Sequence, residues 1–218
     1  MDSFEEIKKY YSRKNTQNEE EYIESHKPRL DYLIRDLRLE NFREKVICEF
    51  GAGSGYVLGH LHKSNKIIAV DGYHIDESDH VLRSTMNLDQ PYSDIFLERY
   101  GQIDIAFSFE MLEHLTNPYN FILELKKVLK EDGLLYLSVP HEMTQHNTYY
   151  PALFYPVDNL IEFFSQMAFK VEGKTIHSKR FVQNVLILRN RPWDEVAMRW
   201  KKDGDEFKGQ PPHVQINL

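Results

Sequence analysis

The feature that most constrains the fold of this chain is a short apolar run that leads directly into three closely spaced glycines. The segment reads Val46-Ile47-Cys48-Glu49-Phe50-Gly51-Ala52-Gly53-Ser54-Gly55. Glycine is needed where the backbone adopts positive φ, or where a ligand approaches the main chain closely. The pattern predicts a buried strand, a tight turn and a helix that begins at about Gly55. In an open α/β sheet such a turn lies at the carboxyl end of its strand, where ligands bind.

Further short apolar runs continue the pattern, and they alternate with segments of helical periodicity. We expect strands at 67–70, 103–109 and 134–139, and helices at 56–62, 93–100 and 120–129, with Gly133 as the stop of the last helix. Continuous apolar runs are typical of parallel strands that are buried on both faces. Strand and helix in regular alternation predict a doubly wound α/β sheet.

The order of elements changes after residue 156. A helix at 157–167 precedes two apolar runs at 169–176 and 181–188. About four residues separate these runs, too few for a parallel crossover, so we expect an antiparallel hairpin. We interpret residues 1–218 as a single domain, composed of a helical N-terminal cap at 1–44 with an amphipathic helix at 27–39, a core at 45–190 and a C-terminal tail at 191–218.

Charge and composition exclude several classes of function. The formal net charge is -7, and no run of Lys and Arg forms the basic face that nucleic-acid binding normally needs. The single cysteine, Cys48, rules out an intramolecular disulfide, and its apolar neighbours favour a buried thiol. No secretory leader pattern and no long apolar stretch is visible, so we expect a cytoplasmic protein that does not span a membrane.

Two details indicate which ligand the glycine turn would hold. The spacing is G-x-G-x-G, and Glu49 ends the strand just ahead of it. A carboxylate there would repel a pyrophosphate, but it suits a ligand that carries an ammonium and a sulfonium group. Asp71 ends the second strand, sixteen residues after Gly55, where it can accept hydrogen bonds from ribose hydroxyls. A turn without any ligand is the alternative interpretation.

These residues together resemble the class I S-adenosylmethionine-dependent methyltransferases, in particular the small-molecule and ubiquinone-biosynthesis-like branch. The resemblance covers about residues 40–190. Besides the glycine segment and Val70-Asp71, it includes Phe107-Ser108-Phe109-Glu110-Met111-Leu112-Glu113-His114-Leu115 and Leu129-Lys130-Glu131-Asp132-Gly133-Leu134-Leu135. The resemblance implies a Rossmann-like, mostly parallel, seven-stranded sheet that ends in the antiparallel hairpin. It also implies S-adenosylmethionine as cofactor and S-adenosylhomocysteine as product.

The resemblance assigns roles to particular positions. The glycines would admit the backbone close to the ligand, Glu49 would act on its amino group, and Asp71 would bind the ribose. Gly72 and Tyr73 would lie near the adenine, as would the segment from Thr85 to Asp89. The complete set of expected cofactor-binding residues is Glu49, Gly51, Ala52, Gly53, Gly55, Asp71, Gly72, Asn87, Leu88, Ser108, Phe109, Glu110 and His114.

Methyl transfer from a sulfonium is an in-line displacement that depends mainly on positioning and on exclusion of water. A hydroxyl acceptor also needs a general base. His141, directly after the fifth strand of the resemblance, is our first candidate and His146 the second. No histidines and acids combine at a convincing metal-ligand spacing. The acceptor would contact His141, His146 and the tyrosines of two variable segments, Tyr10, Tyr11, Tyr149 and Tyr150.

We therefore expect a small-molecule methyltransferase, acting on oxygen in the leading interpretation and on a small amine in another. An RNA or protein methyltransferase is an alternative that the lack of a basic stripe disfavours. A cofactor-binding pseudo-enzyme that acts as an interaction partner is an alternative from a different class. The oligomeric state stays open between monomer and homodimer.

Overall fold

The computed structural model describes residues 19–72, 80–141, 150–177 and 182–194. Its centre is a seven-stranded sheet with the order β3-β2-β1-β4-β5-β7-β6. Strand β7 runs antiparallel to both of its neighbours, and the remaining pairs are parallel. The strands are β1 Val46–Phe50, β2 Lys66–Asp71, β3 Val81–Thr85, β4 Ile103–Phe109, β5 Leu129–Pro140, β6 Phe169–His177 and β7 Gln183–Asn190.

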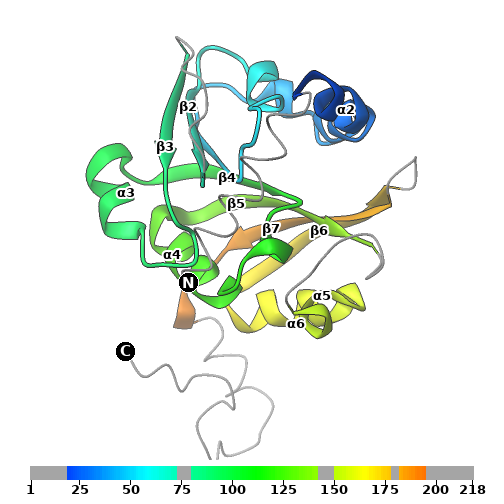
Figure 1. The fold of residues 1–218 in the computed structure, drawn as a ribbon. Helices are drawn as coiled ribbons and strands as arrows, with labels where there is room; N and C mark the ends of the chain where they lie inside the picture. Colours follow the sequence, from blue (N-terminus) through cyan, green and yellow to red (C-terminus); the bar gives the residue numbers. More distant parts are fainter. Residues whose placement is uncertain (1–18, 73–79, 142–149, 178–181, 195–218) are drawn as a thin grey trace, which may run out of the picture.

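Helices cover both faces of this sheet, as Figure 1 shows, with α2 on one side and α5 and α6 on the other. The α-helices are α2 Glu19–Asp36, α3 Ser93–Tyr100, α4 Pro118–Val128, α5 Pro151–Phe154 and α6 Val157–Gln166. Short 3-10 turns lie at η1 Leu39–Asn41, η2 Leu58–His60 and η3 Leu112–His114.

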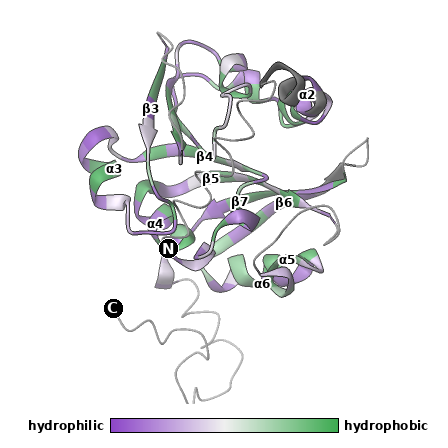
Figure 2. Cartoon of the chain, viewed as in Figure 1, coloured by the Kyte–Doolittle hydropathy of each residue, from purple (hydrophilic) through white to green (hydrophobic). Residues whose placement is uncertain are grey.

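Two apolar cores lie on the two faces. The larger core packs α3, α4, α5 and α6 against the sheet, and Figure 2 shows α5 and α6 as largely hydrophobic helices. The smaller core packs Leu33 and Ile34 of α2 and Leu58 of η2 against Phe107 and Val185. Alternate side chains of a strand point to opposite faces, so the inner strands β1, β2, β4, β5 and β7 each contribute to both cores. The predicted α/β sheet is confirmed, including the antiparallel hairpin of β6 and β7.

The helix predicted at 56–62 is wrong. After the glycine turn the chain makes only the 3-10 turn η2 and then runs in a mostly irregular path to β2 at Lys66. Turns and the 3-10 turn η2 take the place of the expected helix in the segment from Gly55 to Asn65.

Other boundaries also differ from the prediction. Strand β3 was missed, because its pattern is that of an edge strand, with Leu82 nearly half exposed and no continuous apolar run. Helix α2 begins well before residue 27 and accommodates Pro28. Helix α4 ends at Val128, so Gly133 does not stop it, and the positive φ of 62° nearby belongs to Asp132.

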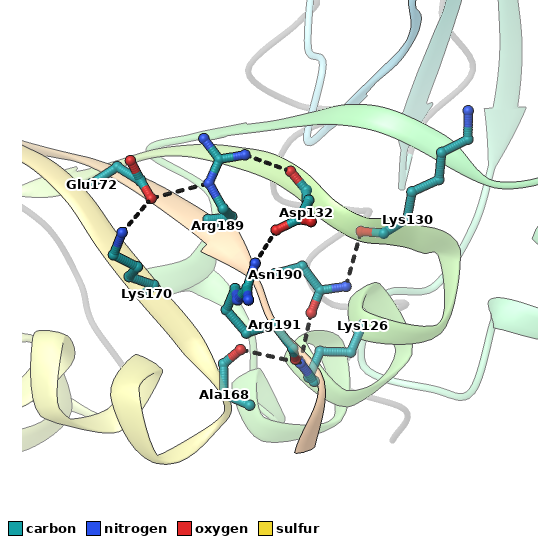
Figure 3. Close-up of polar contacts among 9 residues, drawn as sticks. All are labelled: Lys126, Lys130, Asp132, Ala168, Lys170, Glu172, Arg189, Asn190 and Arg191. Carbon is teal, nitrogen blue, oxygen red and sulfur yellow. Dashed lines mark hydrogen bonds and ion pairs between the residues drawn. The ribbon is translucent and has the colours of Figure 1, made fainter. Parts of the chain in front are cut away.

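At the amino end of β5 a polar cluster joins α4 to the hairpin, as Figure 3 shows. The Lys126 ammonium donates to Oδ1 of Asn190 at 2.6 Å and to the carbonyl oxygen of Arg191 at 3.0 Å. The amide of Asn190 donates in turn to the carbonyl oxygen of Leu129 at 3.0 Å. The cluster lies at the end of the sheet opposite to the glycine turn, and burial lowers the pKa of Lys126 to about 8.

Candidate functional site

The glycine turn is held against the end of β2 by main-chain hydrogen bonds. The N–H groups of Gly51 and Ala52 both donate to the carbonyl oxygen of Val70, at 2.8 and 3.2 Å. Gly55 closes the turn by donating to the carbonyl oxygen of Ala52 at 2.7 Å. Gly51, Gly53 and Gly55 all have positive φ, of 78°, 50° and 73°. The local sequence needs glycine at these positions because side chains rarely adopt this conformation.

The surroundings of Gly51 and Gly53 differ. A Cβ atom added at Gly51 would lie 2.3 Å from Cγ of Met111, so that position is already filled by packing. A Cβ atom added at Gly53 would meet nothing within 4 Å. The space for a ligand therefore lies in front of Gly53, whereas the absence of a side chain at Gly51 is explained by Met111.

Two carboxyl groups face this turn. Oδ2 of Asp71, at the end of β2, accepts a 2.8 Å hydrogen bond from the N–H of Gly53. Glu49 is buried at the end of β1, and its Oε2 has no hydrogen-bond partner. Burial raises the pKa of Glu49 well above its usual range, and the nearby charge of Asp71 adds to the effect. An unpartnered buried oxygen beside an open glycine turn fits a ligand that brings a hydrogen-bond donor.

Arg83, on β3, was not found by the sequence analysis. Its guanidinium lies beside the turn, 3.6 Å from the position of a Cβ atom at Gly55, and its buried Nε and Nη1 have no hydrogen-bond partner. The residue belongs to a strand without an apolar signal, and an isolated arginine carries no motif. Only the pairing of β3 with β2 brings it to the turn.

A second polar group lies at the carboxyl end of β4. Glu110 has a φ of 51°, and its Oε1 accepts a 3.1 Å hydrogen bond from the hydroxyl of Ser138 on β5. Its Oε2 forms an ion pair of 3.2 Å with Nη1 of Arg29, which comes from α2. Both side chains are less than a tenth exposed. Burial raises the pKa of Glu110, while the charge of Arg29 and the Ser138 hydroxyl oppose that rise.

Glu113, in the η3 turn, is fully buried next to this pair, and neither of its carboxyl oxygens has a hydrogen-bond partner. Burial raises the pKa of Glu113 well above its usual range, and Glu110 adds to the rise. His114 is a quarter exposed, with Nε2 at 3.8 Å from Oε1 of Glu113. Arg29 carried no signal as a site residue, because it lies in an ordinary amphipathic helix. Glu113 belongs to the segment that resembles the family, but it was given no role there.

His141 follows β5 and lies against β7. Its Nδ1 is 3.2 Å from Oδ1 of Asn184, and the amide of Asn184 donates to the carbonyl oxygen of Pro140 at 3.4 Å. With the amide in this orientation, the neutral ring tautomer that can donate to Oδ1 of Asn184 carries its proton on Nδ1 and its lone pair on Nε2. Asn184 is a polar neighbour of the His141 ring that the sequence analysis missed.

Of the predicted acceptor-site residues, Tyr150 is described, and its hydroxyl donates to the carbonyl oxygen of Thr116 at 2.7 Å. Four others lie outside the described residues, namely Tyr10, Tyr11, His146 and Tyr149.

The expected adenine-side and methionine-side residues are mostly buried around the turn. Oδ1 of Asn87 accepts from the N–H of Asp89 at 3.0 Å, and Leu88 is buried. Ser108 is fully buried, and its hydroxyl has no partner. Phe109 is buried and Gly72 half-buried, whereas Tyr73 lies outside the described residues. Their contacts with a ligand stay predictions.

In the described parts of the chain, no group of three or more His, Cys, Asp or Glu side chains is placed to hold a metal ion. None of the helices described is both long enough and apolar enough to cross a bilayer.

Comparison with known proteins identifies relatives. A family model described as a methyltransferase domain matches residues 22–175. A ubiquinone biosynthesis O-methyltransferase of Glaesserella parasuis is 31% identical over 98 residues, which are 43% of this chain and 40% of that protein. The chain thus matches less than half the length of this curated relative.

Solved structures share the fold at low sequence identity. An N-methyltransferase from Bradyrhizobium japonicum, in complex with S-adenosylhomocysteine, is 16% identical with a TM-score of 0.58 over 76% of this chain and 87% of that one. A methyltransferase from Aquifex aeolicus is 15% identical with a TM-score of 0.55 over 73% and 88%. These similarities show the fold.

Proposed function

The chain belongs to the class I S-adenosylmethionine-dependent methyltransferases, and from this premise we propose that it methylates an oxygen atom of a small molecule. The curated relative, named as an O-methyltransferase of ubiquinone biosynthesis, supports the choice of oxygen. The net charge of -7 favours a small acceptor over a nucleic acid.

The cofactor would lie across the glycine turn. The unfilled space in front of Gly53 leaves room for it, and Asp71 presents a carboxylate to the ribose hydroxyls. The unpartnered Oε2 of Glu49 would accept a hydrogen bond from the amino group. S-adenosylmethionine supplies a methyl group on a sulfonium, which becomes a neutral thioether when the carbon–sulfur bond breaks.

The acceptor hydroxyl must lose a proton as its oxygen bonds to the methyl carbon. We assign that proton to Nε2 of His141, because Asn184 holds the opposite ring nitrogen at 3.2 Å. The His141–Asn184 pair lies at the carboxyl end of β5, one strand from the end of β4. A general base contributes about 10²–10⁴-fold to such a reaction.

The observation that carries the proposal is the open, positive-φ glycine at Gly53, hydrogen-bonded to Asp71. Isothermal titration of the purified chain with S-adenosylmethionine and S-adenosylhomocysteine tests it. We expect micromolar binding to the wild type that is lost in Asp71→Ala and in Gly53→Val. A well-folded wild-type chain that binds neither compound would overturn the proposal.

A further inference from the structure

Beneath α2 lies a group of buried polar side chains that no assignment above uses fully. We name it the α2 cluster, and its members are Arg29, Glu110, Glu113, Ser138 and Gln183. The new member is Gln183, the first residue of β7. It is 1% exposed, and neither its amide oxygen nor its amide nitrogen has a hydrogen-bond partner.

The register of the sheet places Gln183 on the face that α2 covers. Ser138 pairs with Val185, and Val185 belongs to the core that α2 packs against. Side chains of a strand alternate between faces, so Gln183 lies on the same face as Val185, two residues nearer the end of the sheet. Gln183 therefore lies one strand away from Ser138, on the side of the sheet where Arg29 meets Glu110.

Helix α2 crosses this end of the sheet and covers the cluster. At one side the hydroxyl of Tyr56, after the glycine turn, donates to Oδ1 of Asp31 at 2.6 Å. At the other side Tyr32 is hydrogen-bonded to the side chain of Thr175 on β6. The α2 cluster thus lies between the glycine turn and the hairpin.

Leaving a buried amide unpaired costs free energy, and native proteins rarely do so without a reason. Gln183 leaves two such atoms unpaired, and Glu113 leaves two more. Unpaired buried donors and acceptors under one helix fit a site built for a polar ligand.

The charges in the cluster determine which ligand fits. Arg29 already pairs with Glu110 through Nη1, and only its buried Nε has no partner, whereas an anionic ligand would also meet the carboxyl groups of Glu110 and Glu113. An ammonium ligand would have to lie beside the Arg29 guanidinium. A hydroxyl fits instead, because it can donate to the amide oxygen of Gln183 and accept from its nitrogen.

We propose that the α2 cluster binds the acceptor through an uncharged hydroxyl group, and that Gln183 is the residue that recognises it. This inference rests on the proposed function, since it names the class of acceptor for that reaction. It excludes acceptors whose carboxylate, phosphate or ammonium group would enter the cluster.

The test uses two sets of matched probes with the full-length chain. The first set is 4-methylcatechol, 3,4-dihydroxybenzoate and dopamine, and the second is methyl glucoside, glucuronate and glucosamine. Each set keeps one scaffold and changes its charge. Saturation-transfer NMR measures binding of each probe with and without S-adenosylhomocysteine, for the wild type, Gln183→Leu and the control Gln166→Leu on α6.

We expect at least one uncharged probe to bind the wild type, and its charged analogues to bind about tenfold more weakly. Gln183→Leu should weaken the uncharged probe about tenfold, leave the affinity for S-adenosylhomocysteine unchanged, and raise the melting temperature, because it removes an unpaired buried amide. A residue with a purely structural role would lower the melting temperature. The Gln166→Leu control should change none of these readouts.

The proposal is overturned if no uncharged probe binds, if charged analogues bind equally well or better, or if Gln183→Leu leaves binding unchanged or lowers the melting temperature. If the proposed function itself were wrong, the results would differ from these. In that case S-adenosylhomocysteine would not bind the wild type, whereas an uncharged probe would still bind and would still depend on Gln183.

Discussion

The N–H of Gly53 donates a hydrogen bond of 2.8 Å to Oδ2 of Asp71. This bond joins the first glycine-rich turn to the end of the neighbouring strand, so the turn and the acid are positioned as a unit. The charge of Asp71 also adds to the effect of burial in raising the pKa of Glu49. The turn is thereby ordered before any ligand arrives, which reduces the entropic cost of binding.

Replacement of Asp71 tests this unit. Asp71→Ala removes the acceptor of the Gly53 N–H and the proposed ribose ligand, so we expect affinity for S-adenosylhomocysteine to fall about 100-fold or more. Asp71→Asn keeps an oxygen that can accept from the N–H of Gly53, so its affinity for S-adenosylhomocysteine should fall less than that of Asp71→Ala. Titration calorimetry measures both, with Asp94→Ala on the exposed first turn of α3 as the control. Equal affinities of Asp71→Ala and wild type would contradict the assignment.

The two glycines at 51 and 53 should separate folding from binding. Gly51→Ala places a Cβ atom 2.3 Å from Cγ of Met111 at a φ of 78°, so we expect it to lower the free energy of unfolding by about 2–4 kcal/mol. Gly53→Ala meets no neighbour within 4 Å and should cost only about 1–2 kcal/mol, for its positive φ.

Urea unfolding measures the stability of both variants, and calorimetry measures their binding of S-adenosylhomocysteine. Gly53→Ala should lose most of its binding despite its nearly intact fold. Met111→Ala should partly rescue Gly51→Ala, because it removes the nearest clashing atom. A Gly53→Ala variant that binds like the wild type would show that the space in front of this residue is not used.

The contact of His141 with Asn184 predicts a change in turnover without a change in cofactor binding. Asn184→Leu removes the oxygen that faces Nδ1 of the ring and frees the ring to adopt the other tautomer. With an acceptor found in the probe panel, we expect the kcat of Asn184→Leu to be about 10–100-fold lower than that of the wild type. The kcat of His141→Ala should be lowered at least as much. The affinity for S-adenosylhomocysteine should stay within about twofold of wild type. If Asn184→Leu keeps its full kcat, His141 is not the base held by Asn184.

The contacts of Glu124, on α4, predict how the free energy of unfolding depends on pH. Its Oε2 accepts from the N–H groups of Tyr92 and Ser93 at 2.9 and 2.8 Å, at the start of α3, and its Oε1 pairs with Lys127 at 2.6 Å. Burial opposes ionisation, but the Lys127 and main-chain contacts outweigh it and lower the pKa of Glu124 from 4.5 to about 2. Because the pKa of this carboxyl is lower in the folded state than in the unfolded chain, its charge stabilises the fold at pH values above the unfolded-state pKa. This stabilisation is lost as pH falls through the folded-state pKa.

We therefore expect Glu124→Gln to lower the free energy of unfolding by roughly 1–3 kcal/mol at pH 7. The difference from wild type should shrink between pH 4.5 and pH 2, where the wild-type carboxylate becomes protonated. Chemical unfolding at a series of pH values measures it, with Glu162→Gln on the exposed side of α6 as the control. A difference that does not change with pH would mean that the carboxylate charge is not what holds the start of α3.

The limits of prediction are visible in particular elements. The strand at 103–109 and the helix at 93–100 were predicted with their observed bounds, because their apolar residues follow one period over the whole element. The helix after the glycine turn was not, because the segment from Gly55 to Asn65 folds into turns and the 3-10 turn η2 instead. Strand β3 was not predicted, because it lies at the edge of the sheet, is partly exposed and has no continuous apolar run.

The sequence by itself determined the α/β class, the glycine turn, Asp71 at the end of the second strand and the antiparallel hairpin, because each is encoded by residues close together in the chain. Only the tertiary structure decided that Arg29 pairs with Glu110, that Asn184 holds His141, and that Gln183 is buried without a partner. These contacts join residues from distant elements. They depend on sheet order, on register and on where α2 lies, which hydrophobic periodicity does not specify.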